Sequence, residues 1–134
     1  MQYRNRMGTL GFASLITGWL LSTNLYAAGD GYSIEDYRLG TGGDLVRVCT
    51  IDAGHEHHQI AKAFCYGFFE GATHYDDAIS GSEWYQDIVC APDEATREQA
   101  VTVFIEYINA NPHHGSEPPV DAIFRALVDE WPCE

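Results

Sequence analysis

The sequence predicts an all-α fold, a small disulfide-bonded, up-and-down bundle of about four helices. The first observation is that apolar residues recur at steps of three and four along three stretches, which is helical spacing. The second is the presence of four cysteines in a chain of 134 residues, a length that fits one domain. The third is composition, because 46% hydrophobic and 13% aromatic residues suffice for a core and argue against a disordered chain.

Residues 1–27 have the pattern of a secretory signal peptide. Arg4 and Arg6 form a basic region, and no charged residue follows up to Ala27. Leu25 and Ala27 suit the last positions before a signal peptidase site, so we expect cleavage after Ala27 and export of the remainder. An uncleaved membrane anchor is the alternative, because 21 uncharged residues are just long enough to span a bilayer.

The exported part of the chain is strongly acidic. The whole chain has a formal net charge of −13 at pH 7, and removal of the signal leaves 5 basic and 20 acidic residues. Nucleic acid is excluded as a partner because phosphate binding takes a patch of Lys and Arg. After signal cleavage the net negative charge also repels anionic lipid, so no membrane partner is expected. The acidity favours a cationic partner, although solubility alone also explains it.

Residues 28–43 contain five glycines and few apolar anchors, which predicts a flexible N-terminal arm. We expect the helical domain to span 44–134 and to begin with a short helix from Asp44 to Cys49.

A long helix is predicted from His57 to about Ile79, ended by the residues around Gly81. Gly67 and Gly71 lie in its middle, where each destabilises the helix by about 1 kcal/mol relative to Ala. That penalty predicts a partner helix or loop packed closely against the two glycines. The predicted buried face consists of Ile60, Phe64, Phe68, Ala72, Tyr75 and Ile79.

The third helix is predicted from its capping residues. Thr96 and Gln99 have capping-box spacing, in which the hydroxyl and the amide each bond the other residue's backbone N–H. Asn111 and Pro112 end this helix. Its apolar residues are Ala100, Val101, Phe104, Ile105 and Ile108.

The last helix is predicted to begin near Ser116. Pro118 and Pro119 are compatible with its first turn, where backbone N–H groups need no partner within the helix. Pro132 ends it. The predicted buried stripe consists of Val120, Ile123, Leu127 and Trp131.

All four cysteines, Cys49, Cys65, Cys90 and Cys133, lie in the exported part, and their spacing matches no CxxC zinc site. An even number in a small secreted domain indicates disulfides, with three possible pairings. Antiparallel neighbouring helices favour Cys49 with Cys65 and Cys90 with Cys133. By the loop-closure model these bonds stabilise the fold by roughly 3 and 4 kcal/mol.

The order of cysteines, glycines, helix caps and apolar residues over roughly residues 44–133 matches the pattern of a known family. They are Cys65-Tyr66-Gly67, Gly71, Cys90, Pro92, Thr96, Gln99, Tyr107, Ile108, Pro112, Ala126, Leu127 and Trp131-Pro132-Cys133. In this pattern the chain resembles the Rap/Tai family of periplasmic immunity proteins.

The resemblance implies a periplasmic helical bundle, often a homodimer, that works without a cofactor. It implies a protein partner, namely a peptidoglycan amidase delivered by a type VI secretion system, whose active-site cleft the immunity protein blocks.

Candidate partner-binding residues lie in the loop between the last two helices and among the exposed acids. A polar loop held between two helices can enter a cleft at a low ordering penalty, although an ordinary solvated turn explains the same residues. The candidates are Asn109, Asn111, His113, His114 and Glu117 in the loop, with Asp76 and Asp77 among the acids.

A metal site and three other functions have less support in the sequence. The histidines around Glu56 and at His113 and His114 suggest a metal, but neighbouring histidines do not converge on one point, so no metal site is predicted. An acid-stress chaperone is the alternative function, because protonation of many carboxylates and histidines loosens a fold. An orphan interaction protein is a further alternative. No enzyme is predicted, because no activated nucleophile or phosphate-binding loop is evident.

Overall fold

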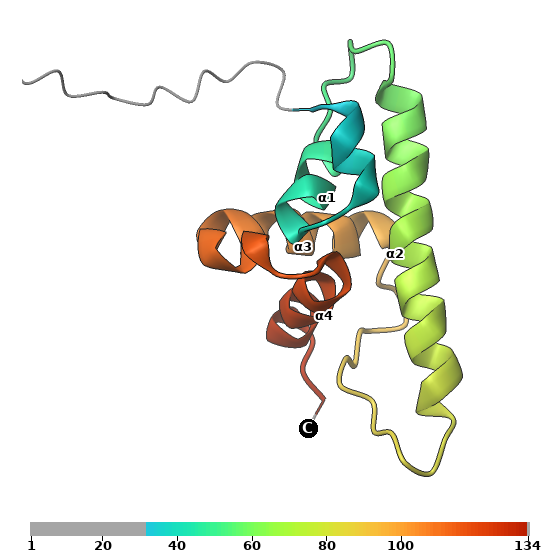
Figure 1. Ribbon diagram of the computed structural model, residues 1–134. Coiled ribbons are helices and arrows are strands. Elements are labelled where there is room, and N and C mark those ends of the chain that lie inside the picture. Colours follow the sequence, from blue (N-terminus) through green and yellow to red (C-terminus); the bar gives the residue numbers. More distant parts are fainter. Residues whose placement is uncertain (1–31, 134) are drawn as a thin grey trace, which may run out of the picture.

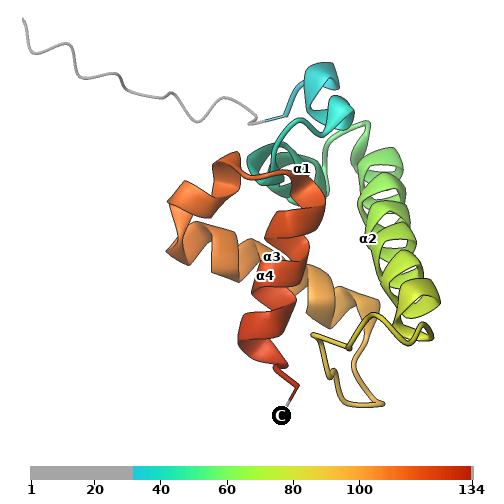
Figure 2. The ribbon, with the colours of Figure 1, turned by 60° about the horizontal axis from the view of Figure 1, so that its bottom comes forward.

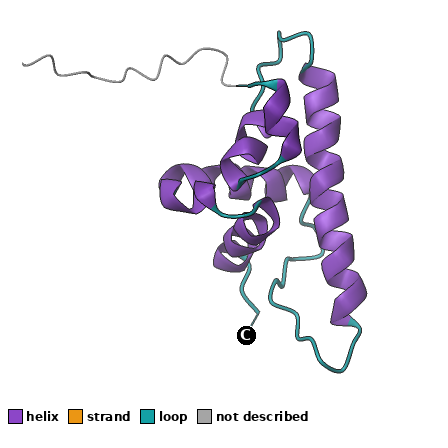
Figure 3. Cartoon of the chain, in the orientation of Figure 1, coloured by secondary structure: helices purple, strands orange, loops and turns teal. Residues whose placement is uncertain are grey.

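The computed structural model describes residues 32–133, so the predicted signal peptide lies outside the described residues (Figure 1). Within them there is no β-strand, only an isolated bridge between Val89 and Pro132 (Figure 3). This confirms the all-α, disulfide-bonded class. The elements are the 3-10 helix η1 (Ile34–Arg38), α1 (Gly42–Cys49), α2 (His58–Ser80), α3 (Arg97–Ala110), the 3-10 helix η2 (Pro112–Ser116) and α4 (Pro119–Glu130).

The short helix α1 is central to the domain. It contacts α2, α3, α4, η1 and η2. Figures 1 and 2 show α2 standing along one side of the other helices, and α3 running across it. The core therefore forms where α1 meets the inner faces of the longer helices. Its largest fully buried side chains are Phe69, Phe104, Leu45, Ile123, Val48 and Cys65.

The buried face of α2 differs from the predicted one by about one residue of helical rotation. Ile60 and Tyr75 are 64% and 68% exposed, whereas Ala61 and Phe69 are buried. Both faces have steps of three and four, so periodicity alone does not choose between them. The disulfide of Cys65 and the contact of Phe69 with Phe104, at 5.5 Å between ring centroids, turn the neighbouring face inward.

The predicted packing against Gly67 and Gly71 is also wrong within the described residues. A Cβ atom added at either position would meet no atom within 4 Å. Gly42 is different, because its Cβ would lie 2.8 Å from the Cβ of Ala122. A close approach thus requires glycine where α1 meets α4, but not in the middle of α2.

The described part of the predicted flexible arm is folded. Residues 34–38 form η1, and Asp36 is buried with its carboxylate accepting a hydrogen bond from Arg47 Nε at 2.9 Å. Helix α1 begins two residues before the predicted Asp44 because Thr41 and Asp44 form a capping box. The bond between Arg47 and Asp36 links α1 to η1, and Arg47 also pairs with Asp44 within α1. An ion pair between residues 11 positions apart, of which only Asp36 is buried, is not visible in local composition.

Replacing Asp36 with asparagine is expected to lower the free energy of unfolding at pH 7 by about 1–2 kcal/mol. Burial alone would raise the pKa of Asp36, but hydrogen bonds from Arg47 and from the backbone of Ser33 hold it below its ordinary value of 3.8. The stabilisation is therefore complete above that value and is lost as the pH falls through the lower pKa of the folded state.

Urea denaturation of both proteins between pH 7 and pH 2 checks this expectation. The difference between wild type and Asp36→Asn should be constant above about pH 5 and should shrink below about pH 3.8. A difference that grows on acidification would contradict the ion pair.

The predicted capping box of α3 is confirmed, with Thr96 Oγ1 accepting from the Gln99 N–H at 3.2 Å. Helix α4 begins later than predicted, at Pro119, because the preceding residues form η2. Its predicted stripe is partly wrong. Val120 is 41% exposed, and small residues, Ala122 and Ala126, fill the face that meets α1 and α3.

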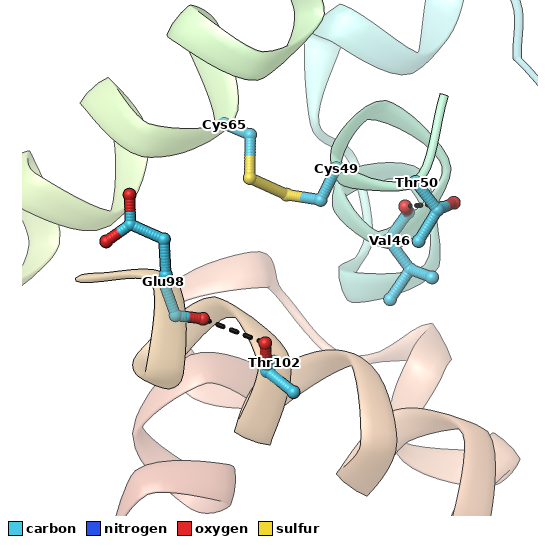
Figure 4. The surroundings of a disulfide bond; sticks show 6 residues. All are labelled: Val46, Cys49, Thr50, Cys65, Glu98 and Thr102. Carbon is cyan, nitrogen blue, oxygen red and sulfur yellow. Dashed lines mark hydrogen bonds between the residues drawn. A yellow bond between two sulfur atoms is a disulfide. The ribbon is translucent and has the colours of Figure 1, made fainter. Parts of the chain in front are cut away.

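The disulfide pairing is confirmed. Cys49 and Cys65 join α1 to α2, with 5.3 Å between their Cα atoms (Figure 4). Cys90 and Cys133 join the loop after α2 to the C-terminal segment, with 4.9 Å between Cα atoms. All four cysteines are therefore structural in this chain.

Candidate partner-binding surfaces

The loop between α3 and α4 is the first candidate surface, and its backbone is firmly held. The Asn111 side chain donates to the carbonyl of Tyr107 at 3.0 Å, and Ser116 Oγ donates to the carbonyl of His113 at 2.9 Å. The N–H of Gly42 donates to the carbonyl of Glu117 at 2.8 Å, which ties the loop to the start of α1. The loop is thus an ordered turn on the surface of the domain.

Glu117 links this loop to α4. One carboxylate oxygen lies 2.7 Å from His114 Nδ1, and the other accepts from Arg125 Nε at 2.9 Å. These hydrogen bonds, first from Arg125 and then from His114, hold the pKa of Glu117 below its ordinary value. The His114 ring stacks on Tyr107, with 5.6 Å between ring centroids. Glu117 and His114 therefore brace the loop, whereas His113 is exposed on it. Asn109 was predicted in the loop but lies, exposed, in the last turn of α3, because the helix continues to Ala110.

The second candidate surface contains Asp76 and Asp77, near the C-terminal end of α2. Both line a cavity of about 490 Å³ bounded by α2, the start of α3 and the end of α4. Tyr85 donates its hydroxyl hydrogen to Asp76 Oδ1 at 2.5 Å. Apolar side chains, among them Phe69 and Trp131, also line the cavity. The lining therefore combines carboxylates with apolar side chains.

A bidentate ion pair closes one side of this cavity. Arg97 donates to both carboxylate oxygens of Glu70, at 2.8 and 2.9 Å. The hydrogen bond from Arg97 lowers the pKa of Glu70, so this carboxylate stays charged. Since both side chains are about two-fifths exposed, the pair positions the start of α3 against α2 more than it stabilises the fold.

The predicted site residues therefore lie on two separate surfaces. The cavity with Asp76 and Asp77 has no lining residue from 109–117. In Figure 1 the η2 turn lies on the far side of the helices from the end of α2. A single small patch on a partner protein therefore cannot contact both the loop and the cavity.

Sequence reasoning missed two features of these surfaces. Tyr107 and Arg125, which hold His114 and Glu117, were not predicted, because the partners lie 7 to 8 residues apart on different elements. Trp84 is 93% exposed in the loop after α2. Its position directly after a predicted helix end could have predicted this exposure, since loop residues are seldom buried.

Neither a metal centre nor a membrane-spanning helix is found in the part of the chain that the structure describes. Between residues 32 and 133, no three His, Cys, Asp or Glu side chains gather in a geometry for metal binding. None of the helices in that range combines the length and apolarity that a membrane crossing requires.

These features define the class of protein as a small disulfide-bonded helical domain that presents ordered polar surfaces. The chain belongs to the family of Rap1a immunity proteins, whose family model matches residues 41–133. No curated protein and no solved structure matches the chain. As a member of an immunity family, the protein binds and inhibits a toxin protein. Two disulfides and this family membership indicate an exported, periplasmic location.

Proposed function

We propose that this protein neutralises a peptidoglycan amidase delivered by a type VI secretion system, by placing the last residues of α3 and the loop that follows (109–117) in the active-site cleft of the amidase. The observation that carries the proposal is the bracing of this loop by Gly42, Tyr107 and Arg125. A loop that is ordered before binding loses little conformational entropy when it enters a cleft. A long flexible loop would lose more and bind less tightly.

The two kinds of loop residue then have different roles. Asn109 and His113 are exposed and make the contacts with the amidase. Glu117 and His114 keep the loop in its bound shape before the amidase arrives. Asn111 does the same through its bond to the backbone of α3.

Asp76 and Asp77 act at longer range. The exported chain has 20 acidic and 5 basic residues, and these two carboxylates border the cavity beside α2. Acidic groups outside the contact surface accelerate association with a basic partner through their long-range electrostatic field. We assign them this steering role toward a basic amidase.

Replacing His113 with alanine is expected to weaken inhibition about tenfold, because exposed residues at the centre of an interface contribute most of its affinity. The measurement is the inhibition constant for a purified amidase acting on peptidoglycan peptide stems. Glu117→Gln should also weaken inhibition, because it loosens the brace without removing an exposed contact.

Gln59→Ala is the matched control, since Gln59 is exposed on α2 away from the loop. It should leave inhibition unchanged. Equal inhibition by wild type and His113→Ala would remove the loop from the interface. Failure of the wild-type protein to inhibit any amidase of a panel would refute the choice of target.

A further inference from the structure

The cavity beside the C-terminal half of α2 is larger than the packing of a small domain requires. Its volume is about 490 Å³, which lies within the range of about 300–1,000 Å³ that is usual for small-molecule sites. Protein interiors otherwise contain few voids larger than a water molecule. No residue of the loop 109–117 lines the cavity, so the proposed inhibition of an amidase leaves its interior without a role.

The walls of this cavity are held in place by bonds within the domain. Val89 lines the cavity and forms the isolated bridge with Pro132, and the neighbouring disulfide of Cys90 and Cys133 ties the same two segments together. Small-molecule sites are usually formed before the ligand arrives, which keeps the ordering penalty of binding low. The cavity meets this condition.

Three aromatic side chains line the cavity. Phe69 comes from α2, Phe124 comes from α4, and Trp131 follows the last residue of α4. Aromatic rings bind apolar groups, and their electron-rich faces also attract cations. The aromatic part of the lining therefore suits an apolar group that carries a positive charge.

The charged side chains of the lining do not cancel. They are three carboxylates, of Glu70, Asp76 and Asp77, and one guanidinium, of Arg97, so their formal net charge is two negative. Glu70 and Arg97 neutralise each other through their two hydrogen bonds. Among residues 32–133, no basic side chain forms an ion pair with Asp76 or Asp77. A cationic ligand supplies the missing partner, whereas an anionic ligand is repelled.

Asp76 is held in place and still has an oxygen available. The Tyr85 hydroxyl donates to its Oδ1 atom at 2.5 Å. This hydrogen bond raises the pKa of Tyr85, so the hydroxyl keeps its proton and remains a donor. A carboxylate has two acceptor oxygens, and Oδ2 of Asp76 can therefore accept from a ligand. A charge-assisted hydrogen bond of this kind is stronger than one between neutral groups.

We propose that the cavity binds a small organic cation, a primary amine joined to an aromatic or similar apolar group. The ammonium group lies at Asp76 and Asp77, and the apolar group lies against Phe69 and Trp131. An uncharged apolar ligand fits less well, because it takes water away from the two carboxylates without replacing their hydrogen bonds. This inference goes beyond the proposed inhibition of an amidase and does not depend on it.

The fluorescence of Trp131, which lines the cavity, measures binding. Beyond residue 27 the chain has one other tryptophan, the exposed Trp84, and Trp84→Phe removes its signal. In this background we expect phenethylamine at pH 7 to change the fluorescence saturably, with a dissociation constant of about 1 mM or below. Phenethyl alcohol and phenylpropionate have nearly the same shape. They should bind at least about tenfold more weakly, because the first is uncharged and the second is an anion.

Substitutions in the lining test the place of binding. Asp77 is exposed, so Asp77→Asn should leave the fold intact while it weakens phenethylamine binding at least about tenfold. Glu106→Gln is the matched control, because it removes one negative charge from an exposed position of α3 outside the lining. It should leave binding unchanged. Ala100→Leu fills part of the cavity and should weaken binding without lowering the thermal midpoint.

Three results would overturn the inference. They are no saturable change up to about 10 mM phenethylamine, equal binding of phenethyl alcohol, and equal effects of Asp77→Asn and Glu106→Gln. A lysine side chain of another protein offers the same ammonium group, and Nα-acetyl-lysine amide is the probe for it. Tighter binding of this probe than of phenethylamine would contradict the assignment to a small aromatic amine. No amidase enters these measurements, so their failure and the failure of the proposed function are distinguishable.

Discussion

Replacing Cys90 and Cys133 together with serine is expected to lower the free energy of unfolding by about 4 kcal/mol. The bond joins residues 43 positions apart, so its loss releases a long loop in the unfolded chain. In the folded chain it supports a weak contact, the bridge of Val89 with Pro132 and the bond from Cys90 N–H to the carbonyl of Trp131 at 2.8 Å. Urea denaturation of the oxidised proteins at pH 7 measures the difference.

The second disulfide provides the comparison. Cys49 and Cys65 are 16 positions apart, so the same model gives about 3 kcal/mol for their replacement by alanine. Both losses are large against the total stability of a small domain, which is typically about 5–15 kcal/mol. A loss below about 1 kcal/mol for the Cys90 and Cys133 variant would show that the C-terminal segment is held mainly by other contacts.

Replacing Phe104 with alanine is expected to destabilise the domain by about 3–5 kcal/mol. Phe104 is fully buried, and its ring meets Phe69 edge-on. The substitution removes this contact and leaves a cavity where α3 crosses α2, which backbone shifts fill only in part. Chemical denaturation of each variant, followed by the helical circular dichroism signal, measures the free energy of unfolding.

Thr102→Ala is the control for Phe104→Ala on the same helix. Thr102 is exposed, and its hydroxyl donates to the carbonyl of Glu98 at 2.9 Å (Figure 4). We expect a change within about 0.5 kcal/mol, as for surface positions generally. Similar losses for both variants would mean that Phe104 is not the centre of the core.

The elements whose signals are local could be predicted from the sequence. Thr96 and Gln99 fixed the start of α3 because both partners of a capping box lie within one turn. Pro119 agreed with the first turn of α4. The disulfide pairing followed from the order of the helices along the chain, since neighbouring helices bring cysteines near their ends together.

The buried face of α2 could not be predicted because two apolar stripes lie side by side on this helix. One includes Ile60 and Tyr75, and the other includes Ala61 and Phe69. Only the tertiary contacts of Cys65 and Phe69 choose between them. As a result the stripe with the bulkier side chains is exposed, although apolar periodicity alone predicts that such a stripe is buried.

The position of the candidate loop was predicted, but the roles within it were not. Asn111 and Pro112 marked the end of α3 in the sequence. The division into exposed residues, such as His113, and bracing residues, such as Glu117, depends on Arg125 and on Gly42, which is 75 positions away. Contacts across that separation leave no trace in the local pattern.

Both disulfides join cysteines that are consecutive along the chain, the first with the second and the third with the fourth. During export the N-terminal part of a polypeptide emerges first, so an oxidase that bonds each cysteine to the next to appear makes the native pairs directly. The second pair is complete only when residue 133 has emerged. Maturation of this protein should therefore need a thiol oxidant but no disulfide isomerase.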